Sequence, residues 1–304
     1  MRGILLKLAS VCAFVAMSTL IKAVRDVVPA GETVFFRSFF ALPVIVAWLV
    51  WRGELGTGLR TANPMGHLWR GLVGTSAMGC GFAALGYLPF PEVTAIGYAA
   101  PLLVVIFAAM FLGEEVRLIR LSAVGLGMIG VAFVLTPRLS VGPEGLGTAE
   151  TLGALLALMG AVFAALAQVF VRRLVRTEAT SAIVFWFSVT AAVLGLMTLP
   201  WGWVVPGGWA AVALVVAGLL GGVGQILLTS SYRMADASLI APFDYSSMLL
   251  AIIVGLAFFG EVPAPTTLIG ATIIIAAGVL IIWRERQLGL ARTAQREVTG
   301  KTGA

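Results

Sequence analysis

The chain has 304 residues, of which 60% are hydrophobic and only 11% are charged, and its mean hydropathy is +1.03. Soluble globular proteins contain about 45–50% apolar and about 25% charged residues. This composition therefore excludes an ordinary cytosolic enzyme, a nucleic-acid-binding domain and a disordered protein. The 36 glycines suit a membrane protein, because small residues let helices approach closely in lipid. We expect an all-α membrane protein.

The net charge of +6 does not indicate a nucleic-acid partner, because the basic residues fall between apolar runs and not along one amphipathic face. Cys12 and Cys80 lie inside apolar stretches without metal-ligand spacing. The single histidine, His67, lies in a polar connection, where we expect it to be exposed. The sequence thus predicts no metal site, no disulfide and no cofactor.

Ten apolar segments come close to the length of about 20 residues that a membrane-crossing helix needs. They are residues 4–24, 33–52, 68–88, 92–112, 118–136, 152–172, 181–200, 209–230, 237–259 and 266–283. We interpret the first as a retained span and not a cleaved signal peptide, because it carries Lys7 and shows no convincing cleavage site.

The longest connection divides the spans five and five. We therefore expect a first five-helix repeat at residues 1–138, an outer-side linker at 139–151, a second repeat at 152–283 and a polar cytoplasmic tail at 284–304.

The distribution of basic residues predicts the orientation. With a cytoplasmic N-terminus, 16 of the 20 Lys and Arg residues, Lys7 and Arg70 among them, fall on the inner side and three on the outer side. Arg37 lies within the second span. Since cytoplasmic loops carry an excess of Lys and Arg, we expect both termini in the cytoplasm and a bacterial-type inner (plasma) membrane.

An internal repeat joins the two halves. At an offset of 147, residues 94–114 align without gaps on residues 241–261, placing Tyr98 on Tyr245 and Glu114 on Glu261. Because each half has five spans, the second half enters the membrane from the opposite side. This pattern predicts inverted repeats, which commonly serve alternating access around a site near the membrane midplane.

Several local patterns occur together with this repeat. They are residues 36–40 (Phe-Arg-Ser-Phe-Phe), residues 235–238 leading to 241–245 (Ala-Pro-Phe-Asp-Tyr), and an apolar helix ending in Leu/Phe-Gly-Glu in both halves. Together they resemble the EamA type of the drug/metabolite transporter superfamily over about residues 4–136 and 152–283. The resemblance implies ten helices in two inverted halves and a metabolite or drug as substrate.

Asp244 is the one acidic residue that falls well within a predicted span. It follows Pro242, and Pro101 follows Tyr98 in the corresponding span of the first half. Proline-interrupted helices in matching spans indicate a transporter site. Asp244 could bind a substrate ammonium or a proton, or orient Tyr245; a helix-packing contact is the alternative.

Further candidates for the substrate site are amides, aromatic residues and one Met/Phe pair, each with helix packing as its alternative. They are Met78, Phe82, Tyr98, Gln168, Trp186, Gln225 and Tyr245. Five residues are assigned gating or structural roles: Arg37, Pro101, Glu114, Pro242 and Glu261. We expect Arg37 to extend to the outer interface. We expect no buried Lys/Arg cluster, so that the cavity would recognise its solute with aromatics, amides and backbone.

Gly125-Leu126-Gly127-Met128-Ile129-Gly130 matches the dinucleotide-binding pattern G-x-G-x-x-G. It lies within an apolar helix, with no preceding strand and no acidic residue about 20 positions later. We interpret it as a helix-packing stripe. The small-residue stripes Gly71-Thr75-Gly79, Ala157-Ala161-Ala165 and Gly218-Gly222 have the same interpretation.

These observations favour a secondary transporter that moves a small organic solute by alternating access. Our specific hypothesis is an amino-acid exporter for aromatic and other apolar amino acids. Import of a vitamin or nucleoside-like metabolite is the alternative within the class. A membrane-embedded enzyme is the alternative from another class, although Ser/His, paired Asp or metal ligands inside the bundle are missing from the pattern. The expected partners are the solute and the bilayer, and the expected state is a monomer.

Overall fold

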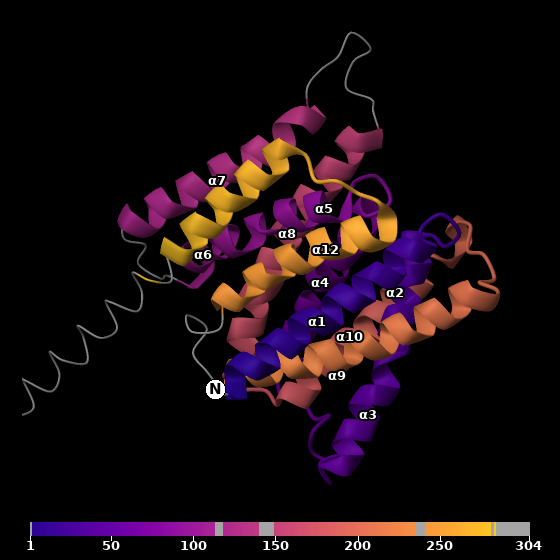
Figure 1. The fold of residues 1–304 in the computed structure, drawn as a ribbon. Helices are drawn as coiled ribbons and strands as arrows, with labels where there is room; N and C mark the ends of the chain where they lie inside the picture. Colours follow the sequence, from indigo (N-terminus) through magenta and orange to yellow (C-terminus); the bar gives the residue numbers. More distant parts are fainter. Residues whose placement is uncertain (1, 113–117, 140–148, 235–240, 281–282, 284–304) are drawn as a thin grey trace, which may run out of the picture.

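The computed structural model describes residues 2–112, 118–139, 149–234, 241–280 and 283. Every regular element within these ranges is a helix, and no strand occurs there. The all-α prediction is therefore confirmed for the described part of the chain, which Figure 1 shows as a bundle of long and short helices.

The first half begins with α1 (Arg2–Val24). It continues with α2 (Ala30–Phe39) and α3 (Ala41–Trp51), α4 (Pro64–Ala84), α5 (Phe90–Gly97) and α6 (Ala99–Leu112), and α7 (Leu118–Leu139). Two of the predicted spans are each divided into two helices. The breaks precede Pro43 and Pro101, each of which lacks an N–H group and crowds the carbonyl four residues earlier.

The second half begins with α8 (Ala149–Leu174), α9 (Thr180–Leu196) and the short 3₁₀ helix η1 (Leu199–Trp201). It continues with α10 (Gly208–Met234), a second 3₁₀ helix, η2 (Ala241–Tyr245), α12 (Ser246–Phe259) and a last helix at Pro265–Leu280. Gly260 ends α12 with φ of 63°, a left-handed conformation that glycine adopts without steric cost.

Among the described residues, five helical segments are long and apolar enough to cross a membrane: Arg2–Val24, Ala30–Trp51, Phe90–Phe111, Ala149–Leu174 and Gly208–Ser231. Four shorter apolar helices accompany them. Large apolar side chains lie exposed on their outer faces; on α12, Leu249 and Ile253 are 66% and 59% exposed. An apolar exterior of this kind suits contact with lipid.

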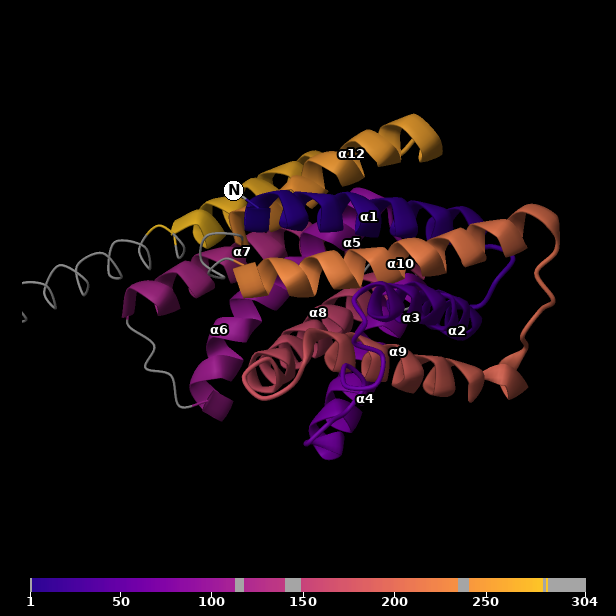
Figure 2. The same ribbon diagram turned by 90° about the horizontal axis from the view of Figure 1, so that it is seen from below.

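Helices from the two halves are interleaved. α1 packs along α10, α4 along α8 and α2 along α9, and Figures 1 and 2 show α1 and α10 side by side from two directions. Small residues permit this approach: a Cβ at Gly218 would lie 2.4 Å from Cβ of Phe40, and one at Gly222 3.0 Å from the carbonyl oxygen of Ala41. The packing role predicted for the Gly218-Gly222 stripe is confirmed.

The G-x-G-x-x-G stretch is a packing surface of α7. A Cβ at Gly127 would lie 2.5 Å from Cδ1 of Leu102, and one at Gly130 would lie 2.8 Å from the carbonyl oxygen of Gly270. Gly125 faces open space. The stretch thus lets α7 approach both α6 and the last helix, as helix packing predicts.

Candidate functional site

A cavity of about 1770 Å³ lies among the helices of both halves. Its wall combines residues of α1, α2, α4, α5, α6, α8, α9, α10, η2, α12 and the last helix. Exposed arginines mark its rim: Arg2 near the start of α1, Arg172 near the end of α8, Arg176 just beyond it and Arg233 at the end of α10. The cavity therefore opens at the end of the bundle where the N-terminus lies.

Toward the other end of α1, beyond the residues that line the cavity, lies an ion pair. Lys22 Nζ lies 2.7 Å from Glu261 Oε1 and donates a hydrogen bond to the Leu88 carbonyl at 3.0 Å. Glu261 Oε2 accepts a hydrogen bond from the Phe90 N–H at 2.8 Å. These contacts join α1 and the α12 terminus to the start of α5. Glu114, the repeat mate of Glu261, lies outside the described residues.

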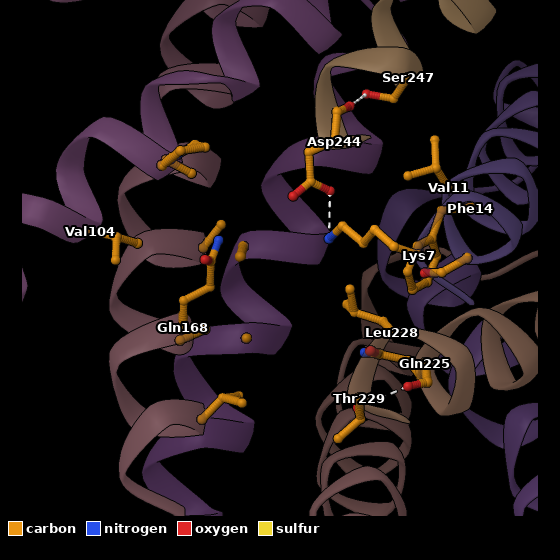
Figure 3. Close-up of a pocket in the computed structure, with 18 of the residues that line it drawn as sticks. Lys7, Val11, Phe14, Val104, Gln168, Gln225, Leu228, Thr229, Asp244 and Ser247 are labelled. Carbon is orange, nitrogen blue, oxygen red and sulfur yellow. Dashed lines mark hydrogen bonds and ion pairs between the residues drawn. The ribbon is translucent and has the colours of Figure 1, made fainter. Parts of the chain in front are cut away.

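Most of the residues predicted for the site line this one cavity. They are Arg37, Met78, Phe82, Tyr98, Pro101, Gln168, Gln225, Asp244 and Tyr245. Gln168 on α8 and Gln225 on α10 face it from opposite sides (Figure 3). Pro242 lies in η2, two residues before Asp244.

Trp186 does not line the cavity. It lies on α9, and its indole N–H donates a hydrogen bond to the Leu59 carbonyl at 3.0 Å. The ring thus holds the connection between α3 and α4. Its neighbour Phe187 faces the cavity instead, because adjacent residues of a helix point about 100° apart.

Asp244 is paired with Lys7, a residue whose sequence position indicated a charge on the cytoplasmic side and no partner. Lys7 Nζ reaches from α1 to within 2.7 Å of Asp244 Oδ1, and the Lys7 side chain is 2% exposed (Figure 3). Asp244 retains 38% exposure of its side chain, toward the cavity. Lysine inside an apolar span is expensive; that cost was the signal in the sequence that Lys7 has a partner.

The two repeat-related tyrosines meet beside Asp244. The rings of Tyr98 and Tyr245 lie 5.2 Å apart at an interplanar angle of 67°, an edge-to-face contact. The Tyr98 hydroxyl and Ser247 Oγ share a hydrogen bond of 2.7 Å. Gly278 has no side chain that would collide with the Tyr245 hydroxyl. The inner wall of the cavity is thus built from corresponding positions of both halves.

The position of Arg37 corrects the expectation that it extends to the outer interface. The whole residue is 2% exposed and lies within the bundle, 5.7 Å from the Phe187 ring centroid. α9 covers α2 there: a Cβ at Gly195 would lie 2.7 Å from the Phe35 backbone nitrogen, and Phe35 packs on Trp203 at 5.2 Å. This cover closes the route by which a long side chain could reach the interface.

Arg70 of α4 reaches the same aromatic ring, with its guanidinium carbon 4.0 Å from the Phe187 centroid. Both arginines line the cavity. Nε and Nη1 of each are buried without a hydrogen-bond partner. The expectation of a cavity without buried Lys or Arg is therefore wrong, because Lys7, Arg37 and Arg70 converge on it from three different helices.

His67 is buried, 3% exposed, although the sequence suggested an exposed position. Its Nε2 lies 3.6 Å from Glu178 Oε2 in the connection between α8 and α9, which covers the start of α4. Burial lowers the pKa of His67, and the nearby Glu178 carboxylate only partly offsets this effect.

Glu178 anchors the polar connection before α4. Its Oε1 accepts hydrogen bonds from the backbone N–H groups of Ala62 and Asn63, both at 2.9 Å, and from the Thr61 hydroxyl at 3.1 Å. Burial by itself raises the pKa of Glu178, but these hydrogen bonds outweigh burial and hold the pKa below its ordinary value.

Comparison with known proteins gives relatives over nearly the whole chain. A pseudopaline exporter, CntI, of Pseudomonas aeruginosa (strain PAO1) is 30% identical over 92% of this chain and 95% of its own. An S-adenosylmethionine uptake transporter of Rickettsia felis is 28% identical over 84% of each chain. A riboflavin transporter of Rhizobium johnstonii is 29% identical over 84% of this chain and 82% of its own.

A solved crystal structure with 23% sequence identity superposes on 94% of this chain and 98% of its own, with a TM-score of 0.65, which shows a shared fold. The profile of the EamA-like transporter family matches residues 1–136 and 151–283. The chain belongs to the EamA-like transporter family, within the drug/metabolite transporter superfamily, as the residue patterns of both halves suggested.

Proposed function

We propose that this protein is a secondary transporter that carries a small organic metabolite across the bacterial-type inner membrane by alternating access. One observation carries the proposal: a large cavity, built from both halves of the chain, has exposed arginines at one end. At the other end we infer that the Lys22–Glu261 ion pair, which joins α1 to the end of α12, closes it. Such a cavity holds a solute in contact with one side only. The transporters among its relatives support the same conclusion over a membrane-embedded enzyme.

The proposal includes the complete topology. Ten spans form two inverted five-helix repeats, at residues 1–138 and 152–283, joined by an outer linker at 139–151 and followed by a cytoplasmic tail at 284–304. Both termini then lie in the cytoplasm, and the protein acts as a monomer. The helices described in each predicted segment and the edge-to-face pair of repeat-related tyrosines support this arrangement.

The proposed substrate is a solute of the amino-acid type, and the proposed direction is export. An ammonium group suits Asp244, whose carboxylate is reachable from the cavity, while the aromatic rings and amides of the wall suit a side chain of moderate size. The alternative is import of a vitamin or nucleoside-like metabolite, favoured by relatives named for uptake of S-adenosylmethionine and for transport of riboflavin.

Counterflow in proteoliposomes tests the proposal. Vesicles containing the purified protein and an excess of unlabelled solute should accumulate the same labelled solute unchanged, from a panel of amino acids and vitamins. Asp244→Asn should lower the rate about tenfold or more, the usual cost of losing a charged hydrogen-bonding partner. Asp26→Asn is the matched control, because the Asp26 carboxylate is 81% exposed and lies away from the cavity.

Recovery of a chemically modified solute would overturn the transport proposal. Counterflow of vitamins without amino acids would replace the substrate assignment by its alternative.

A further inference from the structure

Two arginines in the cavity wall, Arg37 buried and Arg70 half-buried, have no anionic partner among the described residues. Arg37 comes from α2 and Arg70 from α4, and both lie against the ring of Phe187 on α9. No hydrogen bond or ion pair to either guanidinium group occurs within the residues that the structure describes, and Nε and Nη1 of both are buried and unsatisfied. Buried arginine is ordinarily paired with an acceptor, because an unpaired buried charge is costly.

The fold keeps space for both guanidinium groups. Gly74 lies one turn after Arg70 on α4, and a Cβ at this position would collide with Arg70 Nη1. Gly221 on α10 faces Arg37, and a Cβ there would lie 2.9 Å from Arg37 Nε. Glycine at both positions thus leaves open the volume into which the two side chains extend.

The aromatic contact does not replace an anion. The Phe187 ring attracts both cations through its negative face. The two positive charges nevertheless repel each other, since Arg37 is near enough to act on Arg70. A negative group between or beside the two guanidinium groups would stabilise this pair of like charges. A guanidinium group binds a carboxylate through two parallel hydrogen bonds.

The net charge of the cavity wall also favours a negatively charged solute. Seven of the described residues that line the cavity are Lys or Arg: Arg2, Lys7, Arg37, Arg70, Arg172, Arg176 and Arg233. Asp244 is the one acidic residue among the described residues that line the cavity, and it is paired with Lys7. A cavity walled by one sign of charge concentrates solutes of the opposite sign.

We propose that Arg37 and Arg70 form the anion-binding subsite of this transporter and hold a carboxylate group of a solute whose net charge is negative. The subsite deepens the proposed function, on which it rests, by assigning the substrate class. The transported solute then has more carboxylate groups than ammonium groups. Asp244 and Lys7 face the rest of the solute across the cavity.

Binding of simple anions tests the subsite independently of transport. The probes are glutarate, its uncharged diamide glutaramide, and inorganic phosphate, each added to the purified wild-type protein at constant ionic strength set with sodium chloride. Thermal unfolding reports binding, because a ligand that binds only the folded state raises Tm. We expect glutarate to raise Tm and glutaramide to leave it unchanged. This comparison needs no variant.

Variants then locate the effect. Arg37→Gln and Arg70→Gln should each weaken glutarate binding about 10- to 100-fold, the usual loss for a charged hydrogen-bonding partner. Arg37→Lys and Arg70→Lys should bind with intermediate affinity, because an ammonium keeps the charge without the two-pronged geometry. Arg52→Gln is the control, because Arg52 is exposed and pairs with Glu54 outside the cavity.

Four results overturn the subsite proposal. Glutarate and glutaramide could act alike, or the Gln variants could bind glutarate as the wild type does; either result removes the anion subsite. Stronger stabilisation by phosphate than by glutarate would assign the subsite to a phosphate group instead of a carboxylate. Loss of counterflow for every solute with glutarate binding intact would refute the transport function alone. Counterflow of neutral solutes without glutarate binding would refute the subsite alone.

Discussion

At the scale of single residues, two lysines inside the bundle are each paired with a carboxylate. Lys7 pairs with Asp244, and Lys22 pairs with Glu261, each at 2.7 Å. Glu178 takes three hydrogen bonds from the connection before α4. Arg37 and Arg70 differ, because each guanidinium group lies against the Phe187 ring and has no carboxylate partner among the described residues. Both line the cavity, where a bound solute can supply the missing acceptor.

The burial of His67 predicts acid sensitivity of the fold. Since burial holds the pKa of His67 below 6.5, the unfolded chain takes up a proton in a range where the folded protein does not. Stability from this residue is therefore complete above about pH 6.5 and falls as the pH decreases, by up to about 1.4 kcal/mol per pH unit. Thermal unfolding in detergent between pH 5 and 7.5 measures this slope.

His67→Gln should flatten the slope below pH 6.5. The depressed pKa of Glu178 predicts a further loss of stability below about pH 4.5, its ordinary value, and Glu178→Gln should remove that loss while keeping the slope at pH 5 to 6.5. An unchanged slope in His67→Gln would show that other groups control acid unfolding.

At the scale of helices, proline and glycine decide where segments bend and where they touch. Pro101 predicted an interrupted helix, and α5 ends at Gly97, four residues before it. Pro43 likewise breaks the helix that precedes it, although the sequence predicted one uninterrupted span at residues 33–52. Glycine acts through space: Gly130 of α7 and Gly270 of the last helix lie against each other's carbonyl groups.

This contact gives a matched pair of substitutions on one helix. Gly130→Ala would place a methyl group 2.8 Å from a backbone carbonyl oxygen that cannot rotate away, so we expect a loss of about 1–3 kcal/mol. Gly125→Ala enters open space and should instead stabilise α7 by about 0.5–1 kcal/mol, because alanine has the higher helix propensity. Equilibrium unfolding in detergent compares them, and equal effects would contradict the packing described for α7.

The sequence predicted the helical class and several polar and aromatic residues of the cavity wall, because both follow from local patterns: apolar length, a repeated motif and polar residues inside apolar segments. It did not predict the partners of those residues. Lys7 and Asp244 are 237 positions apart in the chain, and only helix packing brings them together. Arg70 lies two residues inside its predicted span, so it was indistinguishable from a loop charge. Trp186 was misplaced because the sequence does not show which side of α9 faces the cavity.

At the scale of the whole molecule, access to the cavity is one-sided. The rim arginines surround the opening near the N-terminus, and Lys22 and Glu261 join α1 to the end of α12 at the other end. We therefore predict that a polar solute reaches Gln168 from the first side only. In the proposed alternating-access cycle, exchange of sides requires separation of this ion pair.

Cysteine labelling tests the one-sided access. In a protein with Cys12 and Cys80 replaced by alanine, Gln168→Cys should react with a membrane-impermeant maleimide applied from the side of the N-terminus. Ala165→Cys, on the same helix and fully buried, should not react. Adding Glu261→Gln should increase reaction from the opposite side, because it removes one charge of the closing pair. Reaction of Gln168→Cys from the opposite side alone, with Glu261 intact, would contradict this account.

The interleaving of helices has a consequence for how such a transporter can move. α1 is held by α10, α4 by α8 and α2 by α9, so each of these close pairs takes one member from each half of the sequence. The halves cannot rock against each other as two intact blocks without pulling these pairs apart. The mechanical units are instead mixed pairs, and the motion that exchanges the open end must slide or tilt one mixed pair past another.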